Sequence, residues 1–379
     1  MIYVCFGRLT DKMARDWYID FLIAQGARVE YWDIVSLVRG EHEERGALQA
    51  DYLRVFRTAQ ELERELHAPE NRAALYIMLV SYNGQLARIF RLLSRARCRM
   101  LNFAWGALPH DPSSPWRKFL TCATNPARCA REIVNRSRAR ALRKFGLVAP
   151  FAVTFAAGAV ATAASAHAEK VVPINYFDYD LYVKAKSAGA PPVVPGRYIV
   201  FLDSNLPFHS DLAFLGYRHI DPVRYYRSLN RFFELLEQAY GVRVVIAAHP
   251  RADYDASTFA QRPMHRLVTA ELVRDADLVL SHTSTAMSYA VLNGKPLMFI
   301  YTDDIAATYE RTFMREMHCY AHRLDAPMCN VDAVHDALAL ALPPVNAGRY
   351  QRYKYDFLTS PESENTPTQE IFWRELCAQ

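Results

Sequence analysis

Two short apolar segments, each followed at once by polar residues, constrain the fold of this chain more than any other feature. Residues 244–248 read VVIAA and precede His249, whereas residues 278–280 read LVL and precede a cluster of hydroxyl groups. A short apolar run between polar or turn residues, followed by a helical pattern, is typical of a buried parallel strand. Ligands of open α/β sheets bind at the carboxyl ends of such strands. The sequence therefore predicts a ligand site that contains His249 and the hydroxyl cluster.

The hydroxyl cluster comprises Ser281, Thr283, Ser284 and Thr285, and an apolar helical pattern follows it at residues 286–292. Serine and threonine are common helix caps. A helix that begins near Ser284 or Thr285 presents free backbone N–H groups, which attract phosphate. Capping and phosphate binding use the same helix terminus, so the cluster is compatible with both.

The order of apolar and helical patterns predicts an α/β protein with two Rossmann-like domains. Strand and helix patterns alternate over residues 1–184, as in a doubly wound domain. Residues 185–196 (AKSAGAPPVVPG) are rich in proline and glycine and predict a linker. A second Rossmann-like domain is expected over residues 197–345. Residues 346–379 are expected to form a C-terminal segment that packs back on the first domain.

Several helices are predicted from local pattern, including two at residues 222–240 and 47–70. Residues 222–240 have helical periodicity and end at Gly241, a common helix stop. Residues 47–70 are predicted as a charged amphipathic helix.

Residues 145–166 carry no charge and follow a basic block, so their length and flank meet a simple criterion for a membrane span. The segment is rich in alanine and contains Pro150 and Gly158, so its insertion free energy is poor. The competing interpretation is a buried strand at residues 151–155 followed by a turn and a helix.

Composition excludes several classes of protein. Of the 379 residues, 51% are hydrophobic, which allows two cores and excludes wholesale disorder. The seven cysteines form no CxxC pair, which argues against a disulfide framework and a zinc site. No GxGxxG motif follows the first strand pattern, so no dinucleotide site is expected. No secretory leader is recognised at the N-terminus, and we expect a cytoplasmic location.

The formal charge of +5 is mild, but positive charge is concentrated in residues 115–146. One interpretation is a solvated helical face. Another is a surface that meets an anionic membrane, peripheral to the inner membrane, or a polyanionic glycan. No nucleic acid is expected as a partner, because no known reader motif or aromatic interleaving is present. The block contains one acidic residue, Glu132, and the basic residues Arg117, Lys118, Arg128, Arg131, Arg136, Arg138, Arg140, Arg143 and Lys144.

Asp203 follows the apolar segment 198–202, and a carboxylate at such a strand end can act as a nucleophile or a base. The structural alternative is an aspartate that begins a turn. His249 precedes Pro250, which favours an extended backbone and can direct the imidazole into the site. The imidazole can bind a phosphate oxygen, although a loop histidine that caps backbone groups is the alternative. Together with the hydroxyl cluster, these groups suit a departing monophosphate, whose developing charge they stabilise without a metal.

These motifs resemble those of GT-B glycosyltransferases that use a CMP-activated sugar. The His249-Pro250 pair and the Ser/Thr motif at 281–285 resemble the CMP-binding motifs of bacterial sialyltransferases and Kdo transferases. FLDSNLPFHSD, RLTDKMARDWYIDFL and PINYFDYD look more like the retaining β-Kdo transferases of bacterial surface-polysaccharide assembly, including lipopolysaccharide and capsule. The resemblance spans most of the chain, and its short motifs are moderately specific.

The resemblance implies a GT-B-like fold with two Rossmann-like domains facing a cleft. By that likeness the second domain binds CMP-Kdo or a related ulosonic acid, and the first binds a glycan or lipid-linked glycan acceptor. It also implies that no cofactor and no metal are needed. It assigns Asp203 as the nucleophile, His249 as a phosphate ligand, and Ser284 and Thr285 as hydroxyl donors to CMP. The acceptor-side base matches no residue here.

Kdo carries a carboxylate at its anomeric carbon, so the site is expected to supply a cation. Arg251, directly after the His-Pro pair, is the first candidate, and Arg8, Lys12 and His209 are candidates for contacts to the carboxylate or the acceptor. The alternative for each charged side chain is a surface salt bridge.

Three other functions stay open at this point. One is an inverting, sialyltransferase-like enzyme in which Asp203 acts as the base. Another is a GT-B transferase that uses a UDP- or GDP-sugar. The third is a non-catalytic protein that binds membranes or polyanions.

Overall fold

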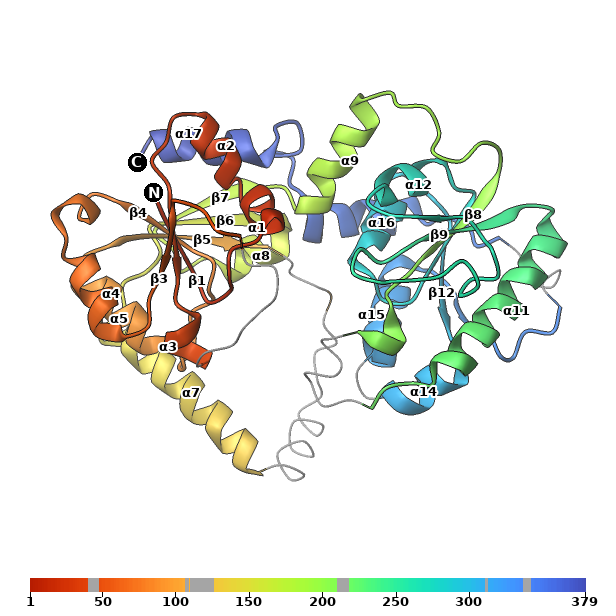
Figure 1. Cartoon of the computed structure of the whole chain (residues 1–379), viewed down its shortest axis with the longest axis horizontal. Helices are drawn as coiled ribbons and strands as arrows, with labels where there is room; N and C mark the ends of the chain where they lie inside the picture. Colours follow the sequence, from red (N-terminus) through yellow and green to blue (C-terminus); the bar gives the residue numbers. More distant parts are fainter. Residues whose placement is uncertain (40–47, 106–108, 110–125, 210–217, 311–312, 337–341) are drawn as a thin grey trace. The chain divides into compact units, whose positions relative to one another are not determined.

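The computed structural model describes residues 1–39, 48–105, 109, 126–209, 218–310, 313–336 and 342–379. The chain forms two compact units (Figure 1). Unit 1 comprises Met1–Ala107, Pro112–Asn175 and Ser360–Gln379. Unit 2 comprises Leu108–Asp111 and Tyr176–Thr359.

Unit 1 consists of a parallel sheet and the helices that connect its strands. The strands are β1 (Ile2–Cys5), β2 (Glu30–Asp33), β3 (Leu53–Val55), β4 (Leu75–Met78), β5 (Arg99–Ala104), β6 (Val153–Ala157) and β7 (Lys170–Ile174). The helices are α1 (Asp11–Asp16), α2 (Ile19–Ala24), α3 (Val35–Arg39), α4 (Ala59–Leu66), η1 (Pro69–Asn71), α5 (Ala87–Arg95), α7 (Pro126–Lys144), α8 (Gly158–Ala164) and α17 (Thr368–Cys377).

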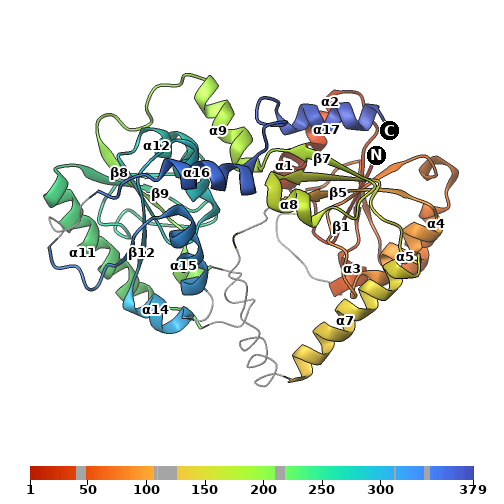
Figure 2. The same cartoon turned by 180° about the vertical axis from the view of Figure 1, so that it is seen from behind.

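The strand order in this sheet is β3-β2-β1-β4-β5-β6-β7, and the neighbouring strands are parallel. Crossovers between parallel strands place helices on both faces of a sheet. Figure 1 and Figure 2 show α2 and α17 on one face, and α4, α5 and α7 on the other. Both faces are therefore covered, which explains why all four residues of β1 are buried and apolar.

The predicted helix at residues 47–70 is wrong in its first half. Leu53–Val55 forms the edge strand β3, which pairs with β2, and only Ala59–Leu66 is helical. Thr58 and Glu61 form a reciprocal capping box that fixes where α4 begins. The charged pattern of the segment did not reveal the edge strand, because pairing with β2 is a tertiary contact.

The segment 145–166 contains a buried strand, β6, followed by α8. This is the strand-and-helix alternative, with the strand two residues later than predicted. Among the residues described, no helix is both long enough and apolar enough to cross a bilayer.

The last twenty residues of the chain belong to unit 1. Phe372 of α17 is buried, with its ring centroid 5.0 Å from those of Phe103 and Phe155. Glu375 accepts a hydrogen bond of 2.7 Å from Lys170 of β7. The helix thus covers one face of the sheet near β5, β6 and β7.

The cysteine pattern argues against a disulfide framework, and one described cysteine is nevertheless paired. Cys129 is disulfide-bonded. The free cysteines of the described chain are Cys5, Cys98, Cys319, Cys329 and Cys377.

Unit 2 consists of a second parallel sheet with its own helices. The strands are β8 (Tyr198–Leu202), β9 (Arg243–Ala247), β10 (Met264–His265), β11 (Leu278–Ser281), β12 (Leu297–Tyr301) and β13 (Met328–Asn330). The helices are α9 (Phe177–Ser187), η2 (Leu206–Phe208), α11 (Pro222–Tyr240), α12 (Thr269–Asp275), η3 (Thr285–Met287), α13 (Ser288–Leu292), α14 (Asp303–Tyr309), α15 (Phe313–Leu324), α16 (Ala347–Tyr353) and η5 (Lys354–Leu358).

The strand order in this sheet is β10-β9-β8-β11-β12-β13, again with parallel neighbours. The prediction of two Rossmann-like α/β domains is therefore confirmed. The main part of unit 2 begins at Tyr176, and α9 packs on α13 and η5 before the segment 185–196 is reached.

The predicted helix at residues 222–240 is confirmed as α11. Asp221 caps its start by accepting from the backbone N–H groups of Val223 and Arg224. Gly241 ends it with φ +62°, a left-handed conformation that glycine adopts without strain. Its inner face buries Phe232 and Phe233 against the sheet.

Candidate functional site

A cavity of about 400 Å³ lies in unit 2 at the carboxyl ends of β8, β9 and β11. These three strands are neighbours, and their registers pair Leu202 with both Ala247 and Ser281. The residues that follow each strand therefore reach the same edge of the sheet. Seven of the predicted site residues line this cavity: Asp203, His209, His249, Pro250, Thr283, Ser284 and Thr285.

Asp203 is buried beside this cavity, with 6% of its surface exposed. Oδ1 accepts a hydrogen bond of 2.9 Å from the N–H of Asn205. Oδ2 accepts from the N–H of His249 at 3.0 Å and from the hydroxyl of Tyr254 at 2.8 Å. Burial raises the pKa of Asp203, and these three donors oppose that rise. The carboxylate is thus both oriented and more basic than an exposed aspartate.

The imidazole of His249 is half-buried, and its ring tautomer follows from one hydrogen bond. Nδ1 lies 3.3 Å from the backbone N–H of Arg251, which donates to it. In the neutral ring the proton is therefore on Nε2, which makes Nε2 a donor. His209 also contributes an imidazole to this region, and the centroids of the His209 and His249 rings are 6.1 Å apart.

Ser284 caps a short helical segment formed by η3 and α13. Its Oγ accepts from the N–H of Ala286 at 3.3 Å, as expected of a cap. Thr283 is half-buried and Thr285 is exposed, and both side chains line the cavity. Thr285 also hydrogen-bonds Tyr176 through its side chain. Ser284 can therefore cap this segment while the side chains of Thr283, Ser284 and Thr285 line the cavity.

Of the predicted site residues that belong to unit 2, two do not line the cavity. Ser281 is fully buried at the end of β11, and its Oγ has no hydrogen-bond partner. Arg251 is exposed, although it directly follows Pro250. Proximity to a strand end in the sequence therefore does not by itself bring a side chain to the site.

His282, within the Ser/Thr motif, has a structural role. It is fully buried, Nδ1 donates to the carbonyl of Ile300 at 2.6 Å, and Nε2 accepts from the hydroxyl of Tyr225 at 2.8 Å. Burial lowers its pKa to about 4, against a partial opposing effect of the bond to Ile300. The neutral ring holds the end of β11 to β12 and α11.

Asp178 is a second carboxylate in the cavity, and the strand-end argument does not find it. It lies in the first turn of α9 and is 7% exposed. Oδ2 accepts from Ser288 Oγ at 2.6 Å, and Oδ1 accepts from the hydroxyl of Tyr289 at 3.3 Å. Burial, and then the charge of Asp178, raises the pKa of Tyr289. The only sequence signal was the segment PINYFDYD as a whole, because acids are common in any first helical turn.

Arg8 and Lys12 belong to unit 1, so neither is among the residues of this cavity. Arg8 is half-buried. Lys12 is exposed on α1 and forms an ion pair with Asp16, one turn along the same helix.

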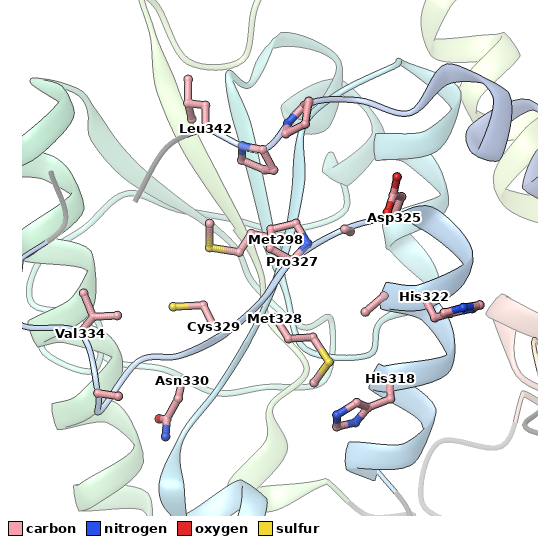
Figure 3. Close-up of a pocket in the computed structure, with 15 residues that line it drawn as sticks. Met298, His318, His322, Asp325, Pro327, Met328, Cys329, Asn330, Val334 and Leu342 are labelled. Carbon is pink, nitrogen blue, oxygen red and sulfur yellow. The ribbon is translucent and has the colours of Figure 1, made fainter. Parts of the chain in front are cut away.

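A larger cavity, of about 920 Å³, lies elsewhere in unit 2 (Figure 3). Among its labelled side chains, Met298 comes from β12, His318 from α15 and Cys329 from β13. None of the predicted site residues lines it. In the described ranges, no group of three or more His, Cys, Asp or Glu side chains is placed to hold a metal ion.

No family model matches the chain, and no curated protein matches it. Among solved structures, it is similar to CalG4, the calicheamicin glycosyltransferase, with a TM-score of 0.51 and 14% identity over 99% of this chain and 97% of that chain. It is also similar to the wall teichoic acid polymerase TagF, with a TM-score of 0.52 and 11% identity over 100% of this chain and 90% of that chain. At such identities the likeness shows the fold alone. The predicted GT-B-like fold class is confirmed by it.

Proposed function

We propose that this protein is a glycosyltransferase whose activated donor binds in the 400 Å³ cavity of unit 2. One observation carries the proposal: Asp203, His249 and the segment from Thr283 to Thr285 meet at one edge of a parallel sheet. This is the edge at which open α/β sheets bind ligands, and the volume lies in the range of small-molecule sites. The GT-B fold, shared with a glycosyltransferase and a polymerase of wall teichoic acid, supports the same class of reaction.

The proposed donor is a CMP-sugar that carries Kdo or a related ulosonic acid. A nucleoside monophosphate leaves as its glycosidic bond breaks, and negative charge develops on the departing phosphate oxygen. The Nε2–H of His249 and the hydroxyls of Thr283, Ser284 and Thr285 are donors suited to that charge. The proposed acceptor is a glycan or lipid-linked glycan, and neither a cofactor nor a metal is required.

In the proposed reaction, Asp203 attacks the anomeric carbon and forms a sugar–carboxylate ester, while the bond to CMP breaks and its electron pair leaves with the phosphate. An acceptor hydroxyl then displaces the carboxylate, giving retention. Two features support Asp203 in this role. Burial raises its pKa, and hydrogen bonds from Asn205, His249 and Tyr254 fix its orientation.

Nucleotide selectivity tests the donor. Thermal unfolding of the full chain should be followed with CMP, UDP and GDP at equal concentration, because a ligand stabilises the state it binds. CMP is expected to raise Tm most, and EDTA is expected to leave that shift unchanged. A larger shift with UDP or GDP would show that the donor is a UDP- or GDP-sugar instead of a CMP-sugar. No shift with any nucleotide would favour a non-catalytic protein.

The covalent step tests the stereochemical course. The chain should be incubated with CMP-Kdo in the absence of acceptor, and its intact mass measured after rapid quenching in acid. A mass increase of one sugar residue, located at Asp203 by peptide mapping, is expected for retention. Turnover without any adduct, together with inversion at the anomeric carbon, would assign Asp203 as a base in a single displacement.

A further inference from the structure

Helix α7 has one face packed on unit 1 and the rest of its surface exposed. The hydroxyl of Tyr82 donates to the carbonyl of Ala139 at 2.8 Å, and the guanidinium of Arg143 lies 4.3 Å from the centre of the Tyr82 ring. Gly84 approaches the backbone of Asn135 so closely that a Cβ there would collide with it. Asn135, Ala139 and Arg143 recur every four residues, so they define the inner face of the helix.

The opposite face carries exposed apolar side chains. Ile133 is 59% exposed and Val134 is 62% exposed. At about 100° per residue, both fall on the side of α7 that faces away from Asn135 and Ala139. Phe145, directly after the helix, is 73% exposed. The exposure of these three large apolar side chains, on α7 and at its end, is not explained by packing within unit 1.

Basic side chains border this apolar strip on both sides. The same helical geometry places Arg136 and Arg140 along one flank and Arg131 and Arg138 along the other. All four are exposed, as is Lys144 at the C-terminal end. Only Glu132 opposes them within α7, and its ion pair with Arg136 is long, at 3.4 Å, and exposed.

We propose that α7 binds the surface of an anionic lipid bilayer, with its axis in the plane of the headgroups. Both parts of the pattern stabilise binding to a lipid interface. Ile133, Val134 and Phe145 enter the acyl boundary, and the flanking cations contact anionic headgroups. Nucleic acids and acidic glycans would use the cations but leave Ile133, Val134 and Phe145 in water. The inference rests on α7 and its contacts alone, and it is independent of the proposed reaction.

Vesicle co-sedimentation of the full chain tests this surface. Two vesicle types are compared, phosphatidylcholine alone and an equal mixture of phosphatidylcholine and phosphatidylglycerol. Two double variants remove one part of the pattern each: Arg138→Gln with Arg140→Gln, and Ile133→Ser with Val134→Ser. The matched control is Val223→Ser with Arg227→Gln on α11 of unit 2. This helix is also 19 residues long, and its Val223 is 65% exposed. Circular dichroism and Tm establish that each variant folds.

The wild type and the control should bind the mixed vesicles, and added salt should weaken this binding. Each surface charge near an anionic bilayer contributes roughly fivefold in affinity, so the arginine variant should bind at least about tenfold more weakly. The apolar variant should lose affinity by about tenfold as well, because less apolar surface is buried. Absence of wild-type binding would overturn the proposal. So would an apolar variant that binds like the wild type, since a purely electrostatic surface would also accept duplex DNA or an acidic glycan.

Discussion

The backbone N–H of His249 donates a hydrogen bond of 3.0 Å to Oδ2 of Asp203, across 46 residues of sequence. The other carboxylate oxygen accepts from Asn205, in its own loop. Asp203 therefore fixes the loop after β8 against the loop after β9, in addition to its proposed reaction with the sugar. Variants at this position must separate the chemical role from the structural one.

Replacing Asp203 by Asn should reduce transfer by at least about a hundredfold, because an amide is not a nucleophile or a base. The Asn side chain has one acceptor oxygen for two backbone donors, so it should also lower the free energy of unfolding by about 1–3 kcal/mol. CMP should still raise Tm, because the ring and hydroxyl donors are intact. Turnover and thermal shift are measured on the same samples.

The matched control is Asp255→Asn, which alters an exposed carboxylate that accepts from Ser257 and Thr258 in the same unit. It should retain full turnover. Full activity in Asp203→Asn would exclude the carboxylate from the reaction, whatever its effect on stability.

Tyr254→Phe should move the acid limb of the pH profile to higher pH. The hydroxyl of Tyr254 donates to Asp203 and so lowers the pKa of that carboxyl, partly against the effect of burial. Without this donor the pKa rises further, and the reactive carboxylate form is lost at a higher pH as the solution is acidified. The measurement is kcat/KM against pH for the two proteins. An unshifted limb would mean that another group controls it.

His249→Ala should weaken CMP binding by about 10- to 100-fold, the usual contribution of a hydrogen bond to a charged group. Isothermal titration of CMP checks this value. His318→Ala is the control, because His318 lines the 920 Å³ cavity of unit 2 and not the proposed site. Equal affinity of the His249 variant and the control would remove the imidazole from the phosphate site.

Stability should fall on acidification because of His282. Its pKa is about 4 in the folded protein and 6.5 as the reference value, so the unfolded chain binds more protons between these limits. The free energy of unfolding is therefore lost as the pH falls through this window, by about 2 kcal/mol between roughly pH 7.5 and pH 5.

Urea unfolding followed by circular dichroism measures this effect. Tryptophan fluorescence does not report directly on unit 2, because the described tryptophans, Trp17, Trp32, Trp105 and Trp373, all belong to unit 1. His282→Gln should be less stable at neutral pH and should lose the part of the pH dependence that His282 contributes. A wild-type stability that does not change across the window would contradict the buried neutral ring.

Ser288→Ala should lower the free energy of unfolding by about 1–3 kcal/mol, because it leaves a buried carboxylate oxygen of Asp178 without its shortest donor. Ser187→Ala is the matched helical control, since its hydroxyl bonds only to a carbonyl in the same turn and is exposed. That change should stay within about 0.5 kcal/mol. Similar effects of both variants would show that the Asp178 contact contributes little to folding.

Much of unit 2 could be predicted because its signals are local. Helix α11 begins and ends where Asp221, Pro222 and Gly241 indicate. The apolar runs at 244–248 and 278–280 became β9 and β11, each within about one residue at either end. Parallel strands bring their carboxyl ends to one edge, so Asp203 and His249 lie close together once β8 pairs with β9.

What the sequence did not reveal depends on contacts between distant residues. Ser281 and Thr283 are two positions apart, but Ser281 is the last residue of β11 and is fully buried, whereas Thr283 lies beyond the strand and lines the cavity. Asp178 reaches the cavity only because α9 packs on α13, which lies 110 residues further along the chain. A residue pattern does not encode such a pairing.

The position of α17 in unit 1 has a consequence for how the protein is made. Ribosomes deliver a chain from its N-terminus, and here the entire unit 2 sequence is translated before Phe372 and Glu375 emerge. Until then the aromatic surface around Phe103 and Phe155 has no cover from α17. Synthesis of unit 2 is therefore complete before unit 1 receives its last helix. A translation product that stops near residue 359 would expose this apolar surface to chaperones.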